Sequence, residues 1–393
     1  MDERRPSMVF ARDRSGSARG QAAGCTLGIG AKKRGHCAMF APLRFLRFLA
    51  LIPGVVLALS GCASLAYLEQ AGAGQDELNR AGRDIDTLVR ERRVPPRTRR
   101  LLGEVRSVKQ YGEEHGLTAT NNYVKYARLN RTAAVWVLSA SEPLRFRSKS
   151  WSFPVIGSIT YLGWFKQDLA NAAAAKLRAE GWDVDVRAAG AYSTLGWFDD
   201  PVLSTMIAKG DEALGDLVNT VLHESLHATF YVNGQSVLNE SIAGFVGDAL
   251  TIAYLDERVG PLSPEKKAYV DAEAKGEARA EAMREGYRAL EALYASPLPD
   301  DAKRAEKERR LTLLRARIGF KRPINNATLG QFKTYDSGQA ELAALLRACD
   351  GSFPRFLAAL APLRTTRLDP QQKDVGKMIA PLLQGRCPAG TER

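Results

Sequence analysis

The spacing of apolar residues is most regular over residues 211–231. Leucines and valines recur there at mixed three- and four-residue intervals, which predicts a helix. A second apolar helix is expected over about 240–256, after a polar turn. Patterns earlier in the chain predict helices over 97–130 and 166–180 and strands over 132–138, 150–165 and 182–192. Strands that precede helices indicate an α+β fold, with a small β-sheet before a mainly helical part.

A long charged helical hairpin is expected over residues 263–319. Ser263 and Pro264 are a typical N-cap and first-turn pair, and a charged helical pattern follows them. The sequence SPLP at 296–299 interrupts this pattern before a second charged helix begins. Such dense charge is typical of a solvated face. Three shorter helices are expected near 337–348, 352–361 and 370–384.

The N-terminal part of the sequence has the features of a signal peptide. Arg44 and Arg47 precede an apolar run of about a dozen residues, which is too short to cross a bilayer comfortably. The run ends in LSGC at 59–62, which resembles the lipobox of bacterial lipoproteins. The resemblance implies cleavage before Cys62, lipid attachment to Cys62 and anchoring in the outer membrane, facing the periplasm. An ordinary secretory signal that happens to end in a cysteine is the alternative.

These signals divide the chain into four parts. Residues 1–38 lack apolar periodicity and precede the signal peptide of residues 39–61, so we interpret them as a non-native extension or a disordered leader. Residues 62–96 are expected to form an anchor or linker region. Residues 97–390 are long enough to bury the core of a single domain.

The charge of the chain is concentrated at its N-terminal end. The formal net charge is +12 over 393 residues, of which 45% are hydrophobic. Residues 1–61 hold 10 Lys or Arg and 3 Asp or Glu, which leaves 46 basic and 41 acidic residues in the rest of the chain. Because the basic excess belongs largely to the leader, no nucleic-acid partner is expected.

Two cysteines remain beyond Cys62, namely Cys349 and Cys387. The periplasm permits disulfide bonds, so these two residues are a possible pair. Two buried thiols are the alternative, and the sequence leaves both open.

The sequence VLHESLHATF at 221–230 contains two of the four histidines of the chain. On a helix, His223 and His227 project from the same face one turn apart, so both imidazoles can bind one metal ion. Glu224 lies about 100° around the helix, where it can reach a metal-bound water without binding the metal. H-E-x-x-H on a helix is the pattern of zinc metallopeptidases, with Glu224 as catalytic base. A pair of partly buried structural histidines is the alternative.

A catalytic zinc ion takes three protein ligands and leaves one position open for water. Glu240 opens the second apolar helix, and the glycine-containing turn before it can bring this helix back to the histidines. Glu240 is therefore the predicted third ligand, although the helix dipole alone also favours a glutamate in a first turn. Asp248, two turns further on, is the alternative ligand or a partner that orients a histidine. We expect one Zn²⁺ per chain.

HESLH followed by NESIAGF resembles the gluzincin metallopeptidases, which carry H-E-x-x-H and then N-E-x-x-S-D. The chain resembles more closely the bacterial family of predicted aminopeptidases, with its H-E-L-A-H-like helix, its Y-V-x-G-D-T link and its F-N-E-S-F-A-T-F-V-E segment. HESLH, YVNGQSV and LNESIAGFVGD correspond to these here, and AYSTLGWFDDPVLSTM, FPVIGSITYLGWF and INNATLGQFKTY are also similar. The resemblance covers most of residues 100–365. It departs at Gly247, which stands where the family has an acidic residue.

The resemblance implies a zincin-like helical part and a zinc-dependent peptidase, most simply an aminopeptidase, acting on peptides at the cell envelope. Tyr192 and Tyr335 lie in family-like segments and are candidate donors to the oxyanion, with ordinary packing as the alternative. Asp199 and Asp200 are candidates for binding a substrate α-amino group, or they cap a turn. An envelope endopeptidase with the same zinc mechanism and a non-catalytic metal-binding lipoprotein are the alternative functions. The second is disfavoured because structural zinc usually takes four protein ligands.

Overall fold

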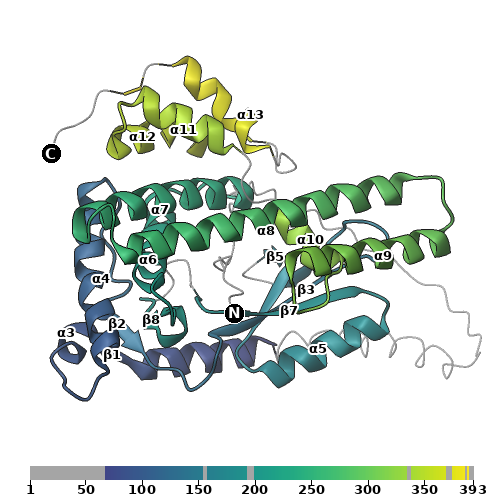
Figure 1. The fold of residues 1–393 in the computed structure, drawn as a ribbon, viewed down its shortest axis with the longest axis horizontal. Helices are drawn as coiled ribbons and strands as arrows, with labels where there is room; N and C mark the ends of the chain where they lie inside the picture. Colours follow the sequence, from purple (N-terminus) through teal and green to yellow (C-terminus); the bar gives the residue numbers. More distant parts are fainter. Residues whose placement is uncertain are drawn as a thin grey trace, which may run out of the picture. The chain divides into compact units, whose positions relative to one another are not determined.

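The structure, a computed structural model, describes most of the chain beyond the leader (Figure 1). The described residues are 67–153, 157–192, 199–333, 338–368, 374–385 and 387–388. The leader, Cys62 and Tyr335 lie outside them. The described residues from 71 onward belong to one compact unit of the chain, and residues 67–70 belong to another. All labelled elements below belong to the first unit.

Within the described residues, every strand precedes α6, and helices make up the rest. Residues 67–81 are helical. They are followed by β1 (Gly82–Asp84), α3 (Ile85–Leu88), α4 (Pro96–Glu114), β2 (Lys125–Ala127), β3 (Val135–Ser141), β4 (Trp151–Phe153), β5 (Gly157–Ile159), β6 (Tyr161–Trp164), α5 (Gln167–Ala179), β7 (Asp183–Ala189), β8 (Val202–Leu203), α6 (Ala213–Thr229), α7 (Ser236–Arg258), α8 (Pro264–Ala295), α9 (Asp300–Ile318), α10 (Asn326–Gly330), α11 (Gln339–Ala348), α12 (Phe353–Leu360) and α13 (Val375–Ile379). This mixture confirms the α+β class. Within these ranges, no helix combines the length and the hydropathy that a membrane span requires.

The strands form three small sheets rather than the single sheet expected. β3 is central in the first sheet, antiparallel to β6 on one side and to β7 on the other. β2 is central in the second, antiparallel to β1 and parallel to β8. β4 and β5 pair with each other. Strands as short as β1, β2 and β8 are too brief to show an alternating pattern, which is why the sequence did not indicate the second sheet.

Helices cover both faces of the β6–β3–β7 sheet. β3 has the sequence VWVLSAS and is buried along almost its whole length, as expected of a strand with no solvated face. α5 packs against it through Ala170, which joins Trp136 in a small core cluster. Figure 1 shows α5 on one side of this sheet and α9 and α10 on the other. The sheet therefore anchors the helical part that follows it.

α6 is buried over nearly all of its length and forms the centre of the largest core cluster. Its apolar side chains point in all directions around the helix, which is the pattern of a helix surrounded by protein. α4, α7 and α8 pack around it. The polar residues in the C-terminal half of α6 are therefore withdrawn from bulk water.

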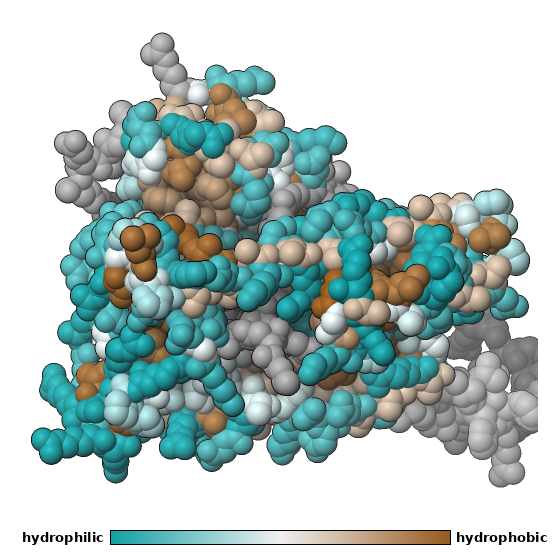
Figure 2. All heavy atoms as spheres, in the orientation of Figure 1, coloured by the Kyte–Doolittle hydropathy of each residue, from teal (hydrophilic) through white to brown (hydrophobic). Residues whose placement is uncertain are grey.

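α8 and α9 form the expected helical hairpin. Oγ of Ser263 accepts a hydrogen bond from the backbone N–H of Lys266 at 3.2 Å, and Pro264 occupies the first turn, so the helix begins where the sequence predicts. Figure 2 shows hydrophilic residues over most of the hairpin on the face drawn, with apolar residues in small groups between them. The dense charge of this segment is therefore largely a solvated face.

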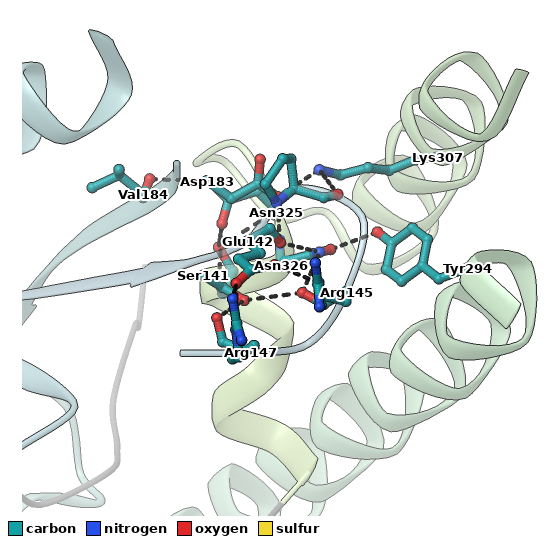
Figure 3. A network of polar contacts seen from close by, with 12 residues as sticks. Ser141, Glu142, Arg145, Arg147, Asp183, Val184, Tyr294, Lys307, Asn325 and Asn326 are labelled. Atoms are coloured by element: carbon teal, nitrogen blue, oxygen red, sulfur yellow. Dashed lines mark hydrogen bonds and ion pairs between the residues drawn. The ribbon is translucent and has the colours of Figure 1, made fainter. Parts of the chain in front are cut away.

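A buried ion pair fastens the hairpin to the β6–β3–β7 sheet (Figure 3). Nζ of Lys307 on α9 is bonded to Oδ2 of Asp183 on β7 at 2.5 Å and to the carbonyl oxygen of Pro143 at 3.0 Å. The backbone N–H of Asn326 donates to the same Asp183 oxygen at 2.9 Å. Asn326 also accepts a hydrogen bond from the hydroxyl of Tyr294 on α8 at 2.7 Å. Four elements thus converge on one carboxylate and one amide.

The C-terminal helices pack on α7. Phe356 of α12 meets Phe245 of α7 with ring centroids 5.7 Å apart. A disulfide bond joins Cys349, which follows α11, to Cys387 near the end of the described chain. Of the two arrangements that the sequence left open for these cysteines, the structure contains the bonded pair.

Two boundaries differ from the sequence-based expectation. The helix expected over 97–130 ends at Glu114, because Gly116 adopts a positive φ of 87° and the N–H of Leu117 bonds back to the carbonyl of Gly112 at 2.9 Å. In addition, residues 82–88, within the segment expected to be an anchor or linker, contribute β1 and α3 to the unit.

Candidate metal centre

α6 presents His223 and His227 from one face, as their spacing predicts. Their Nε2 atoms lie 3.2 Å apart, and the two rings meet edge to face with centroids 4.9 Å apart. The side chain of His223 is 11% exposed and that of His227 is 4% exposed. Both imidazoles therefore offer the same nitrogen to one buried point.

α7 supplies the third side chain. Oε2 of Glu240 lies 3.4 Å from Nε2 of His223, and Oε1 lies 3.5 Å from Nε2 of His227. α7 begins at Ser236, so Glu240 lies beyond its first turn. The attraction of a carboxylate to a helix N-terminus, which fades after the first turn, therefore does not account for its place.

Asn239 holds the connection between the two helices. Its Oδ1 accepts the backbone N–H of Val232, and its Nδ2 donates to the carbonyl of Val232, both at 2.9 Å. Gly234, at φ 74°, allows the turn that these bonds close. The pair of hydrogen bonds fixes the first turns of α7 against residues 230–235 and so sets where Glu240 meets the histidines.

The distances among the three side chains fit a single metal ion. Nitrogen and oxygen ligands at about 2.0–2.1 Å from a tetrahedral ion lie about 3.3–3.4 Å from one another. The corresponding distances here are 3.2, 3.4 and 3.5 Å. All three ligand atoms belong to one group whose members lie within 4.8 Å of each other. His223, His227 and Glu240 are thus a possible metal site.

The electrostatics of these residues favour the same conclusion. Burial lowers the pKa of His227 to about 4, against the opposing effect of Glu240, and burial raises the pKa of the Glu240 carboxyl. Nδ1 of His227 and Oε2 of Glu240 are buried and take part in no hydrogen bond. Leaving a buried polar atom without a partner costs about 1–3 kcal/mol. A cation between the three ligand atoms would supply the partner that the Glu240 oxygen lacks.

Glu224 stands next to the metal site without belonging to it. It follows His223 directly on α6 and is 5% exposed. The group of possible metal ligands does not include it. A base that acts on a metal-bound water must lie beside the metal ligands without being one of them, which a neighbour of His223 outside the ligand group can do. The catalytic role of Glu224 stays a prediction.

Gly247 and Asp248 explain how α7 approaches α6 so closely. A Cβ atom at Gly247 would lie 3.3 Å from Cβ of His223, so glycine gives the helices room to pack. Oδ1 of Asp248 accepts hydrogen bonds from Nδ2 of Asn219 at 2.5 Å and from the hydroxyl of Tyr269 at 3.3 Å. Asp248 is not part of the metal-ligand group. It contacts the ligand helix one turn before His223 instead.

The tyrosines expected near the site are placed only in part. Tyr192 is half-buried and meets the ring of Phe165 edge to face, with centroids 5.1 Å apart. Tyr335 lies outside the described residues. The donor role expected of these two tyrosines stays a prediction. His115 lies at the end of α4, where Nδ1 is 2.8 Å from the carbonyl oxygen of Tyr111.

The candidates for amine recognition occupy different environments. Asp199 is exposed, whereas Asp200 is 2% exposed. The backbone N–H of Asp200 donates to Oδ1 of Asn122 at 3.0 Å, and its carbonyl accepts the N–H of Tyr123 at 2.7 Å. Tyr123 was not expected from the sequence to lie here. It is fully buried, and the nearby carboxylates of Glu224 and Asp200 add to the rise in its pKa that burial causes.

Comparison with known proteins identifies the family of the chain. A family model described as "Putative aminopeptidase" matches residues 66–374. The comparison with curated proteins found no match, and neither did the comparison with solved structures. The matched segment contains the three possible metal ligands and Glu224. Because it spans most of the chain, this protein belongs to that aminopeptidase family.

Proposed function

We propose that this protein is a zinc-dependent aminopeptidase of the bacterial cell envelope. The observation that carries the proposal is the convergence of two imidazoles and one carboxylate at 3.2–3.5 Å, with the uncoordinated Glu224 beside them. Two histidines and a glutamate with a neighbouring glutamate are the donor set of catalytic zinc in peptidases. The family of the chain supports an aminopeptidase among the peptidases.

His223, His227 and Glu240 would hold the ion. When bound, zinc would polarise the scissile carbonyl and make a water molecule acidic enough to attack near neutral pH. Glu224 would take the proton of that water and deliver it to the leaving amine. The burial of Glu224 keeps bulk water away from this proton transfer, and its anchoring in the middle of α6 fixes its distance from the histidines.

Asp200 is the better of the two candidates for binding the α-amino group of the substrate. It is buried, whereas Asp199 is exposed, and its charge acts on Tyr123 together with that of Glu224. An aminopeptidase needs a carboxylate as the partner for the terminal ammonium of its substrate, and a buried one binds that ammonium more strongly than an exposed one. This arrangement favours removal of N-terminal residues over cleavage within a chain.

The leader supports the proposed compartment. The LSGC sequence ending at Cys62 is the basis for lipid attachment, and an anchor there would hold the peptidase on the outer membrane, facing the periplasm. The disulfide between Cys349 and Cys387 is compatible with an oxidising compartment. Periplasmic peptides would then be its substrates.

Hydrolysis of a peptide library by the zinc-loaded protein tests this function. We expect cleavage of free N-terminal residues and no cleavage of the same peptides after N-acetylation, with Glu224→Gln as the inactive control. Cleavage of acetylated peptides at internal bonds would instead identify an endopeptidase. A folded, zinc-containing protein that cleaves neither set would contradict a peptidase function.

A further inference from the structure

A cavity of about 420 Å³ lies between the β3–β4 connection and α8, and none of its lining residues belongs to the candidate metal centre. Residues 144–146 of the connection form one wall, and Tyr287, Glu291 and Tyr294 of α8 form most of the other. These three residues follow one another at four- and three-residue intervals, so they project from one face of the helix. The volume lies within the range of about 300–1,000 Å³ that small-molecule sites occupy in proteins.

Buried polar groups hold the β3–β4 connection in place (Figure 3). Nδ2 of Asn326, a fully buried residue, donates to the carbonyl oxygens of Glu142 at 2.8 Å and Arg145 at 3.4 Å. Nζ of Lys307 donates to the carbonyl oxygen of Pro143 at 3.0 Å. These bonds fix the backbone of this wall before any ligand arrives, and such preorganisation lowers the cost of binding.

Three aromatic rings line the cavity. Phe146 stacks on Tyr287 with ring centroids 3.9 Å apart, and its ring lies 5.6 Å from that of Tyr294. The hydroxyl of Tyr287 donates to Oε1 of Glu291 at 2.9 Å. The hydroxyl of Tyr294 donates to Oδ1 of Asn326 at 2.7 Å. Because both hydroxyls are engaged, the rings are held in place and offer mainly apolar surface to a ligand.

Each wall also carries a charge. Arg145 in the connection is 66% exposed and shares the carboxylate of Glu142 with Arg147, so these three residues keep one positive charge in excess. Glu291 on α8 is exposed and supplies a carboxylate. A ligand in the cavity therefore meets a guanidinium on one wall, a carboxylate on the other and aromatic rings on both.

We propose that this cavity binds a free α-amino acid with an apolar side chain. The guanidinium of Arg145 holds the carboxylate of the amino acid, and the carboxylate of Glu291 holds its ammonium group. The aromatic rings bury its side chain. A ligand with one charge or none would engage at most one of the two charged walls. The inference goes beyond the proposed function and does not depend on it, although free amino acids are what an aminopeptidase releases.

Calorimetric titration of the zinc-loaded full chain with L-phenylalanine tests the proposal. We expect saturable binding to the wild type and at least about tenfold weaker binding to Arg145→Gln and to Glu291→Gln, because each variant loses a charge-assisted hydrogen bond. Arg309→Gln and Glu285→Gln are the matched controls, since both residues are exposed on the hairpin and neither lines the cavity. The controls should bind like the wild type. Absence of saturable binding to the wild type, or equal affinity in all five proteins, would overturn the proposal.

Two analogues of phenylalanine separate the roles of the two charged walls. N-acetyl-L-phenylalanine lacks the ammonium group, and L-phenylalaninamide lacks the carboxylate. We expect the wild type to bind each at least about tenfold more weakly than phenylalanine. Glu291→Gln should weaken binding of the amide further and leave that of the N-acetyl compound unchanged, and Arg145→Gln should do the reverse. An N-acetyl compound that binds as tightly as phenylalanine would contradict recognition of the ammonium group.

Glu240→Ala distinguishes this cavity from the metal centre, because the amine and carboxylate of an amino acid can also bind a metal ion. We expect phenylalanine to bind Glu240→Ala with wild-type affinity. Binding that disappears in this variant would place the amino acid at the metal centre and overturn the proposal. If the wild type cleaves no peptide but binds phenylalanine in a Glu291-dependent way, the proposed function fails and the amino-acid site stands.

Discussion

Oε2 of Glu240 lies 3.4 Å from Nε2 of His223, although the two side chains come from different helices. Neither helix alone fixes this distance. The connection over residues 230–235 determines how α7 returns along α6, and Asn239 closes that connection with two hydrogen bonds to Val232. The geometry of the metal site therefore depends on a residue that binds no metal.

Asn239→Ala should weaken metal binding while leaving all three ligands in the chain. The substitution removes both hydrogen bonds to Val232, so the first turn of α7 is no longer held against residues 230–235. We expect a fall of about 10–100-fold in metal affinity, the range found when supporting residues of metal sites are removed. Titration against a competing chelator would measure it. Ser236→Ala, an exposed position in the same turn, is the control, and equal affinities for the two variants would contradict the role given to Asn239.

Glu224→Gln should separate binding from catalysis. The amide keeps the shape of the side chain but cannot accept the proton of the attacking water. We expect unchanged metal content and a fall in kcat of about 10²–10⁴. Metal analysis and peptide hydrolysis on the same preparation would show both. Loss of the metal in this variant would mean that Glu224 is a ligand, against the group that the structure brings together.

Lys307→Met should destabilise the protein without affecting the metal site. Lys307 is 4% exposed and neutralises Asp183, whose Oδ2 also accepts the N–H of Asn326. Breaking a buried ion pair by removing one partner costs about 3–5 kcal/mol. Denaturant unfolding would measure this loss, and Arg304→Met, at an exposed position of α9, should stay within about 0.5 kcal/mol of the wild type. A cost for Lys307→Met as small as that of the control would show that the pair does not fasten the hairpin.

Reduction of the disulfide bond should lower the melting temperature. The Cys349–Cys387 bond closes a sequence separation of 38 residues. Such a crosslink stabilises a protein by about 2–4 kcal/mol, mainly by restricting the unfolded chain. Thermal unfolding with and without reductant would show the difference, and Cys387→Ser should melt at the lower temperature in both conditions. A wild-type melting temperature that does not respond to reductant would contradict a bonded pair.

Local signals predicted the elements that carry the site. The apolar spacing of α6 and α7, the Ser263–Pro264 start of α8 and the SPLP break lie within short stretches, so the sequence alone indicates them. The H-E-x-x-H spacing likewise depends only on helix geometry, which is why His223 and His227 face one point.

Contacts between distant segments could not be predicted in the same way. Tyr123 lies about a hundred positions before Glu224, and no pattern around it distinguishes it from the other tyrosines. The β1–β2–β8 sheet joins strands of two or three residues from three parts of the chain. Asn239 begins the NES sequence that carries the family resemblance. Its bonds to Val232 depend on how the turn over residues 230–235 folds, and no local pattern indicates that.

The metal content of the purified protein tests the central claim most directly. Mass spectrometry of the wild type, of His227→Ala and of Glu240→Ala would be compared after zinc is supplied and the excess removed. We predict about one zinc ion per wild-type chain and a loss of tightly held zinc in both variants, because a site with two protein ligands is too weak to retain it. A well-folded wild type that retains no zinc, or a Glu240→Ala variant that retains all of it, would contradict the three-ligand site.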